Sequence, residues 1–161
     1  MDEFFNEPSQ TTYLTMKGLQ KLETELEILR TVERPLLANK LHEVMENLDP
    51  SEDNEYLLVK DEQSMLEGRI LQLEMILSCV KIIQPGNGNG EISLGSIVVV
   101  QEGDGPLETF NLVGSAEADS KEGLISNESP LGKSLIGHKV GELVSVRAPD
   151  GEIGFKIISV T

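Results

Sequence analysis

Residues 46–56 read Glu-Asn-Leu-Asp-Pro-Ser-Glu-Asp-Asn-Glu-Tyr. This stretch holds five carboxylates and no basic side chain. Its proline, serine, aspartates and asparagines favour turns, and a long segment with helical spacing of apolar residues lies on each side of it. The sequence therefore predicts two antiparallel helices that meet in a hairpin, whose end we call the acidic tip (residues 46–56).

The chemistry of the acidic tip is compatible with a metal ion. Close like charges repel one another, so a bound cation would stabilise the tip. Oxygen ligands without histidine or cysteine favour Mg²⁺, Mn²⁺ or Ca²⁺ over zinc. Composition alone favours a simpler alternative, a solvated acidic loop on an acidic protein.

The totals limit the class of protein. A chain of 161 residues with 39% apolar content forms one or two small domains. Its net charge of −15 argues against direct binding to a nucleic acid and fits a protein that docks on a larger, basic partner. A single cysteine excludes an internal disulfide. The acidic N-terminus is unlike a signal peptide, and no apolar run is long enough for a membrane helix, so we expect a cytoplasmic protein.

Two helices are predicted, from about residue 16 to 47 and from 55 to 82, with Thr15 as the N-cap of the first. Each carries a coiled-coil seam, the apolar stripe that faces the other helix. The first seam consists of Leu19, Leu22, Leu26 and Leu29, followed by Leu37, Leu41, Val44 and Leu48. The second consists of Val59, Gln63, Leu66, Ile70, Leu73, Leu77 and Val80. The first seam loses its phase just before Pro35, where a kink or a break is expected.

Four segments are expected. Residues 1–12 form a loose arm, residues 13–83 the hairpin, residues 84–91 a linker rich in glycine, and residues 92–161 a second domain. In the second domain, four short β-branched runs predict a small antiparallel sheet, with strands at 96–100, 108–113, 143–148 and 154–160. A short helix or turn is predicted between residues 129 and 140. The fold class is therefore α+β.

Several motifs between Tyr13 and Val160 match those of a known family. They are Leu-Thr-Met-Lys-Gly-Leu at 14–19, Glu-Arg-Pro at 33–35, Glu-Asp-Asn-Glu-Tyr at 52–56, Leu-Glu-Gly-Arg-Ile at 66–70, and Ile-Ser-Asn-Glu-Ser-Pro-Leu-Gly-Lys-Ser at 125–134. With these motifs, the chain resembles the GreA/GreB-type transcript-cleavage factors of bacterial RNA polymerase.

The resemblance implies a fold and a function. The fold is an N-terminal coiled coil followed by an FKBP-like domain. The partner is bacterial RNA polymerase, which the factor enters through the secondary channel, with the 3′ end of nascent RNA contacted only indirectly and no membrane involved. Such a factor is no enzyme by itself, because it stimulates the polymerase's own cleavage of backtracked RNA. It shares Mg²⁺ with the polymerase, binds none tightly when isolated, and is expected to be a monomer.

The resemblance also assigns roles to individual residues. The catalytic and metal-directing acids are Asp49 and Glu52. The residues that support them at the tip are Asp53, Glu55 and Tyr56. The residues expected to bind the polymerase are Glu128, Ser129 and Pro130.

The acidic tip departs from the family pattern at Met45, Leu48, Pro50 and Asp53. An alternative function is therefore a non-catalytic factor of the same fold that occupies the channel and inhibits transcription. A free-standing FKBP-like isomerase is disfavoured, because Phe110 and Phe155 are the only aromatic residues beyond the linker.

Overall fold

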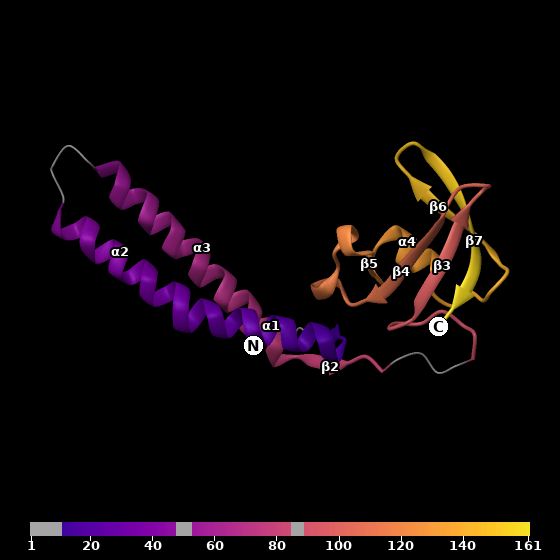
Figure 1. Ribbon diagram of the computed structural model, residues 1–161, viewed down its shortest axis with the longest axis horizontal. Helices are drawn as coiled ribbons and strands as arrows, with labels where there is room; N and C mark the ends of the chain where they lie inside the picture. Colours follow the sequence, from indigo (N-terminus) through magenta and orange to yellow (C-terminus); the bar gives the residue numbers. More distant parts are fainter. Residues whose placement is uncertain (1–10, 48–52, 85–88) are drawn as a thin grey trace, which may run out of the picture. The chain divides into compact units, whose positions relative to one another are not determined.

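The computed structural model describes residues 11–47, 53–84 and 89–161. The chain divides into two compact units: Leu19–Cys79 is helical, and residues up to Gly18 join Val80–Thr161 in a unit built around β-sheets. The predicted class, a helical hairpin followed by a small β domain with a short helix, is confirmed (Figure 1).

The hairpin consists of three helices and one wider turn. α1 (Met16–Ile28) leads into a π turn, η1 (Leu29–Glu33), and then into α2 (Arg34–Glu46). α3 (Asp53–Ser78) returns beside α2 (Figure 1). At 1.5 Å per residue, α3 is about 39 Å long.

The predicted seams are confirmed. Leu22 and Leu29 on the first helix and Ile70 and Leu73 on α3 are buried, as are Val59 and Leu66 nearer the acidic tip. The remaining described seam residues are half-buried: Leu19, Leu26, Leu37, Leu41, Val44, Gln63, Leu77 and Val80. Apolar residues one position away from the seam are instead exposed, for example Leu71 at 58%. The heptad spacing therefore identified the buried face of both helices.

The distortion expected at Pro35 takes the form of a π turn, and the helix does not break there. Leu37 and Leu41 stand one residue later than the spacing from Leu29 requires. A π turn holds one residue more than an α turn, so η1 absorbs the extra residue and returns both leucines to the seam. Pro35 follows directly, at the start of α2, where a missing N–H costs least.

The second helix is shorter than predicted, because α3 ends at Ser78. Val80–Ile82 forms strand β2, which pairs in parallel with β1 (Thr12–Leu14). The β-branched residues of 80–83 find a partner strand there, and tertiary pairing overrides the helical spacing. Thr15 is the predicted N-cap, since its hydroxyl oxygen accepts the N–H of Gly18 at 3.0 Å.

The C-terminal sheet has five strands in the order β5-β4-β3-β7-β6. Their bounds are Ile97–Glu102 (β3), Leu107–Val113 (β4), Leu124–Ser126 (β5), Leu143–Ala148 (β6) and Gly151–Val160 (β7). Four strands pair antiparallel, as predicted, while β5 adds in parallel to β4. The sheet is therefore mixed, and β5 went unpredicted because three residues show no period.

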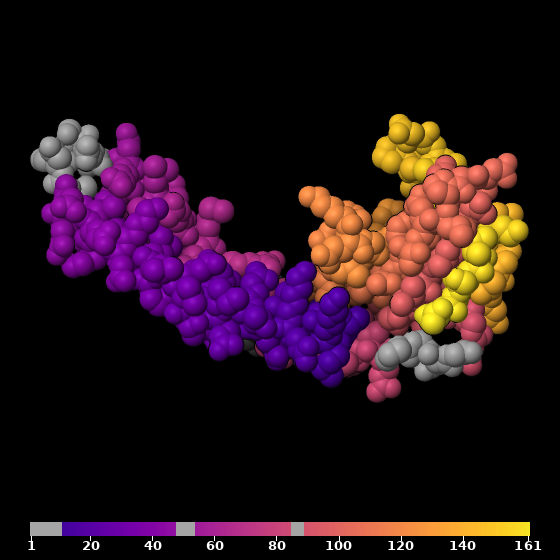
Figure 2. Space-filling view, in the orientation of Figure 1, coloured from indigo at the N-terminus to yellow at the C-terminus, as the bar shows by residue number. Residues whose placement is uncertain are grey.

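The core of this unit lies on one face of the sheet. Alternate residues of β3, β6 and β7 point into it, and Leu135 of α4 (Pro130–Leu135) completes it. Two short 3-10 turns, η2 (Ser115–Glu117) and η3 (Ser120–Glu122), lie between β4 and β5. The turn between β6 and β7 stands out in the space-filling view (Figure 2), and the side chain of Arg147 beside it is 92% exposed.

No helix in the part of the chain that the structure describes combines the length and apolarity needed to cross a bilayer.

Candidate functional site

The two candidate catalytic acids fall between the helices of the hairpin. α2 ends at Glu46 and α3 begins at Asp53, so Asp49 and Glu52 connect the two helices and lie outside the described residues. Asp53 is described only by its backbone, as the first residue of α3.

Two described residues of the acidic tip, Asn47 and Glu55, lie at the ends of the helices. Asn47 ends α2: its backbone N–H and its side-chain amide both donate to the carbonyl of Glu43, at 3.1 and 2.9 Å. Glu55 is exposed in the first turn of α3, where the helix dipole favours a negative charge. This effect helps the chain to tolerate acids at the start of α3.

Tyr56 and Lys60 form a contact one turn further along α3. The Lys60 ammonium lies 6.0 Å from the centre of the Tyr56 ring, at the outer limit of a cation–π interaction. Its Nζ also donates to Oε1 of Gln63 at 3.2 Å. The ring of Tyr56 is half-buried, so it packs on the helix while Glu55 projects into solvent.

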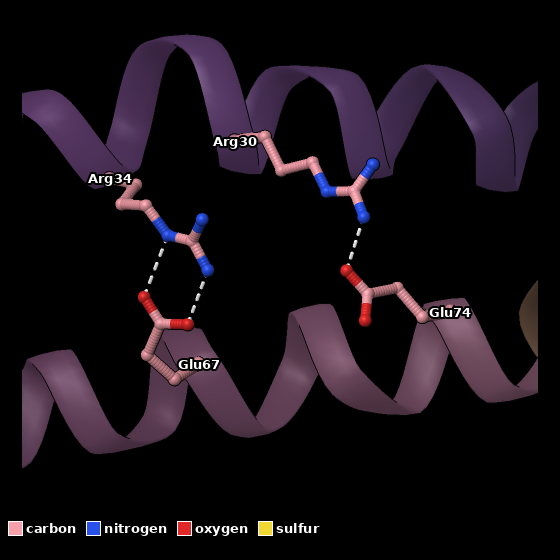
Figure 3. Close-up of polar contacts among 4 residues, drawn as sticks. All are labelled: Arg30, Arg34, Glu67 and Glu74. Carbon is pink, nitrogen blue, oxygen red and sulfur yellow. Dashed lines mark hydrogen bonds and ion pairs between the residues drawn. The ribbon is translucent and has the colours of Figure 1, made fainter.

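Other cations of the hairpin are engaged in ion pairs between helices. Lys40 bonds Glu62 at 2.9 Å, Arg34 bonds Glu67 and Arg30 bonds Glu74. In these three pairs the cation comes from the first helical segment and the acid from α3; Figure 3 shows two of them side by side. A fourth pair runs the other way: Nε and Nη2 of Arg69 in α3 donate to the two carboxylate oxygens of Glu25 in α1, at 2.7 and 3.0 Å. Arg34 and Lys40 are therefore both held by glutamates of α3.

Among the ion pairs of α2, Arg34 makes the most directional contact. Its Nε donates to Oε1 of Glu67 at 2.7 Å, and its Nη2 donates to Oε2 (Figure 3). These hydrogen bonds lower the pKa of Glu67 below its ordinary value and raise the pKa of Arg34. This pair was not predicted from the sequence, although the antiparallel pairing of the two seams would bring the start of α2 near the middle of α3.

The predicted polymerase-binding residues lie on one tight turn before α4. Ser129 is the N-cap: its hydroxyl oxygen accepts the N–H of Gly132 at 3.0 Å, while the hydroxyl donates to the carbonyl of Ser126 at 2.7 Å. Pro130 follows as the first helical residue. Glu128 and Pro130 are exposed, whereas Ser129 is half-buried. The turn therefore presents Glu128 and Pro130 outward, and the Ser129 hydroxyl holds the turn.

Gly132 makes this turn possible. A Cβ at its position would lie 2.1 Å from the carbonyl oxygen of Ser126, closer than any side chain tolerates. Only glycine lets α4 approach the end of β5 this closely.

The described residues offer no catalytic pocket. The hairpin has a groove of about 380 Å³ beside Leu36 and Leu66, bordered by the Lys40–Glu62 pair. Its lining is apolar apart from Glu33 and that pair, and it holds no nucleophile with a neighbouring base. Phe110 and Phe155 contribute to the core of the sheet and are not available to line an aromatic site. Across residues 11–47, 53–84 and 89–161, no three metal-binding side chains gather in one place.

Comparison with known proteins places this geometry in a family. Residues 12–82 match the family model described as transcription elongation factor, N-terminal, and residues 87–161 match the model described as transcription elongation factor, GreA/GreB, C-term. The transcription elongation factor GreA of Bacillus cereus (strain AH187) is 46% identical over 155 residues, which cover 94% of this chain and 98% of that protein. GreA of Bacillus subtilis (strain 168) is 44% identical over 149 residues, covering 92% and 95%.

Solved structures also align over most of the chain. GreA factor homolog 1 (Gfh1) of Thermus thermophilus is 34% identical and aligns with a TM-score of 0.43 over 94% of this chain and 99% of that one. A GreA/GreB factor of Nitrosomonas europaea is 19% identical and aligns with a TM-score of 0.41 over 93% and 98%.

Proposed function

The chain belongs to the GreA/GreB family of transcription elongation factors, and we propose that it binds bacterial RNA polymerase in the secondary channel and stimulates cleavage of backtracked nascent RNA. The observation that carries this proposal is the order of elements along the chain. In sequence, Asp49 and Glu52 stand between the end of α2 and the start of α3, whereas the candidate docking residues lie in the other unit.

The proposal assigns a different role to each of the two units. Glu128 and Pro130, exposed on the turn before α4, contact the polymerase. The hairpin carries the acidic tip to the polymerase active centre. In this proposal, the chain adds carboxylates of the acidic tip to an active site that the polymerase supplies.

The acids of the tip fit a magnesium ion by their chemistry, since both carry carboxylate oxygens and neither histidine nor cysteine lies in residues 46–56. Asp49 and Glu52 would hold the ion together with ligands of the polymerase. Bound there, magnesium supplies Lewis-acid stabilisation and an activated water for phosphodiester hydrolysis. We propose that the factor works as a monomer in the cytoplasm, binds no magnesium tightly on its own, and reaches the RNA 3′ end only inside the polymerase.

The direct test uses a stalled, backtracked elongation complex with Mg²⁺. The wild-type chain should shorten the RNA and restore synthesis, while Asp49→Asn and Glu52→Gln should bind the complex and lose cleavage by orders of magnitude. If the lost role is ligation of the ion, residual activity of Asp49→Asn should rise with Mg²⁺ concentration.

Asp53→Asn is the matched control, because it removes one charge from the same segment and restores the residue of the family motif. It should retain activity. If the wild-type chain stops RNA synthesis without shortening the RNA, the inhibitory alternative replaces the proposal. The departures from the family pattern at Met45, Leu48 and Pro50 are the reason for considering that alternative. Cleavage by Asp49→Asn at the wild-type rate would remove the role of the tip acid.

A further inference from the structure

The hairpin has a proximal half, with α1, η1 and the C-terminal part of α3, and a distal half, with α2 and the N-terminal part of α3. The two halves differ in which side chains are buried. In the proximal half, Leu22 of α1 and Leu29 of η1 are buried, as are Ile70 and Leu73 of α3. In the distal half, no residue of α2 is fully buried. In this half, α2 therefore covers the buried Val59 and Leu66 of α3 with side chains that are themselves only half-buried.

Because of the π turn, one charged residue falls on a position of the heptad spacing that the seam follows. Continuing the spacing from Leu29 with the one residue that η1 adds gives positions 34, 37, 41 and 44. Three of these are apolar and half-buried: Leu37, Leu41 and Val44. The fourth is Arg34, the first residue after the π turn, so a guanidinium begins the distal seam.

The guanidinium of Arg34 is fixed to α3 in a single geometry. Nε and Nη2 each donate to a different oxygen of the Glu67 carboxylate, the parallel two-bond arrangement that arginine forms with a carboxylate (Figure 3). Further along α2, the single Nζ of Lys40 donates to both carboxylate oxygens of Glu62. An ammonium group restricts the orientation of its partner less than a planar guanidinium does. Arg34 is therefore the most demanding contact across the distal half.

Such a contact affects register more than stability. Both side chains are about half exposed, and exposed ion pairs add little to the free energy of unfolding. A seam of similar leucines, however, allows two helices to slide or rotate against each other. A contact beside the seam that needs two directional hydrogen bonds is satisfied in only one of these alignments, so it favours that alignment over the others.

We infer that Arg34 is a positioning residue: through its two hydrogen bonds with Glu67 it fixes the register of α2 against α3, and with it the place of the acidic tip. The register itself is a property of the isolated hairpin. The consequence for cleavage rests on the proposed function. A displacement of the reacting groups by about 1 Å can cost about 100-fold in rate, so a small change in register is enough to matter.

The register is tested by a distance measurement that needs no polymerase. Spin labels on cysteines at Asn39 of α2 and Ser64 of α3, both exposed, report the alignment of the distal half in a Cys79→Ser background. Arg34→Ala should shift or broaden the distance distribution. Arg34→Lys keeps the charge without the two parallel bonds and should do the same, while the exchange Arg34→Glu with Glu67→Arg should restore the wild-type distribution.

Arg30→Ala is the matched control. Arg30 bonds Glu74 on the same side of the hairpin but precedes the distal half, so its loss should leave the distribution unchanged. Circular dichroism checks that each variant keeps its helices. An Arg34→Lys distribution that superimposes on the wild type in a folded protein overturns the inference.

The consequence is tested in the cleavage assay with saturating factor. Arg34→Lys should lower the maximal cleavage rate by about 10- to 100-fold, while the factor concentration that gives half the effect stays the same. If the distance changes and the wild-type chain proves unable to stimulate cleavage, the register role stands and the proposed function fails. If cleavage falls while the distance distribution is unchanged, Arg34 acts by another route and the inference is wrong.

Discussion

Glu67 is the residue whose titration reports directly on the hairpin. Its carboxylate accepts two hydrogen bonds from Arg34, and these hold its pKa below the ordinary value for a glutamate. A carboxyl whose pKa is lower in the folded state contributes stability that is present above its unfolded pKa. That contribution is lost as the pH falls through the folded pKa.

We therefore predict that carbon-detected NMR finds the Glu67 carboxyl titrating below the usual glutamate range, and that Arg34→Ala returns it to that range. The melting temperatures of the wild type and Glu67→Gln should differ most at neutral pH and converge in acid, where Glu67 is protonated in both states. A Glu67 pKa that is unaffected by Arg34→Ala would show that the two side chains do not pair in solution.

At the scale of single elements, the seam makes a sharp prediction because α3 carries buried and exposed leucines two residues apart. Leu73 is fully buried and Leu71 is 58% exposed. Truncation of a buried leucine removes apolar contacts and leaves a cavity, so Leu73→Ala should lower the free energy of unfolding by about 2–5 kcal/mol. Leu71→Ala, with the same chemical change and the same helix propensity, should lie within about 0.5 kcal/mol of the wild type. Chemical denaturation measures both, and equal effects would contradict the assigned face of α3.

The π turn can be tested by removing the residue that it accommodates. Deletion of Val32, which is 48% exposed, should close η1 to an α-helical turn and keep every later leucine in the seam. In that continuous α-helix, the ring of Pro35 would meet the carbonyl four residues earlier, at a cost of about 3 kcal/mol. The deletion alone should therefore destabilise the hairpin, and the deletion combined with Pro35→Ala should recover helix content and melting temperature. A deletion variant as stable as the wild type would show that the π turn is not needed for the proline.

At the scale of the whole molecule, the sequence predicted the parts that follow from long-range periodicity. The change from heptads to short β-branched runs located both structural classes, and the turn-forming residues of 46–56 located the end of the hairpin. It also predicted that Pro35 would disturb the helix. The form of that disturbance was not predictable. A π turn can be recognised only when the structure shows that the seam residues before and after it lie on the same face of the helix.

Three-residue elements escaped prediction for a related reason. β1, β2 and β5 are too short to show a period, and each exists because another segment pairs with it. Of the candidate site, Glu128 and Pro130 are exposed on a turn whose geometry Ser129 and Gly132 determine, and their docking role stays a prediction. The ion pairs between the helices depend on which residues face each other across the hairpin, and spacing along one helix does not contain that information.

The separation of tip and docking residues into two units leads to the last prediction. If docking and cleavage are independent, a chain with Asp49→Ala and Glu52→Ala should occupy the polymerase without cutting RNA. It should then inhibit the wild-type factor competitively, with half inhibition near equal concentrations, because both bind through the same turn before α4. Adding Glu128→Lys or Pro130→Ala to this inactive chain should relieve the inhibition, since each changes an exposed side chain while the Ser129 cap that holds the turn is kept. The measurement is a titration of each variant against a fixed amount of wild-type factor on backtracked complexes, with direct binding to polymerase measured in parallel. Full inhibition by the triple variant Asp49→Ala, Glu52→Ala, Glu128→Lys would contradict docking through Glu128, and failure of the inactive chain to compete would mean that the tip acids themselves contribute most of the binding.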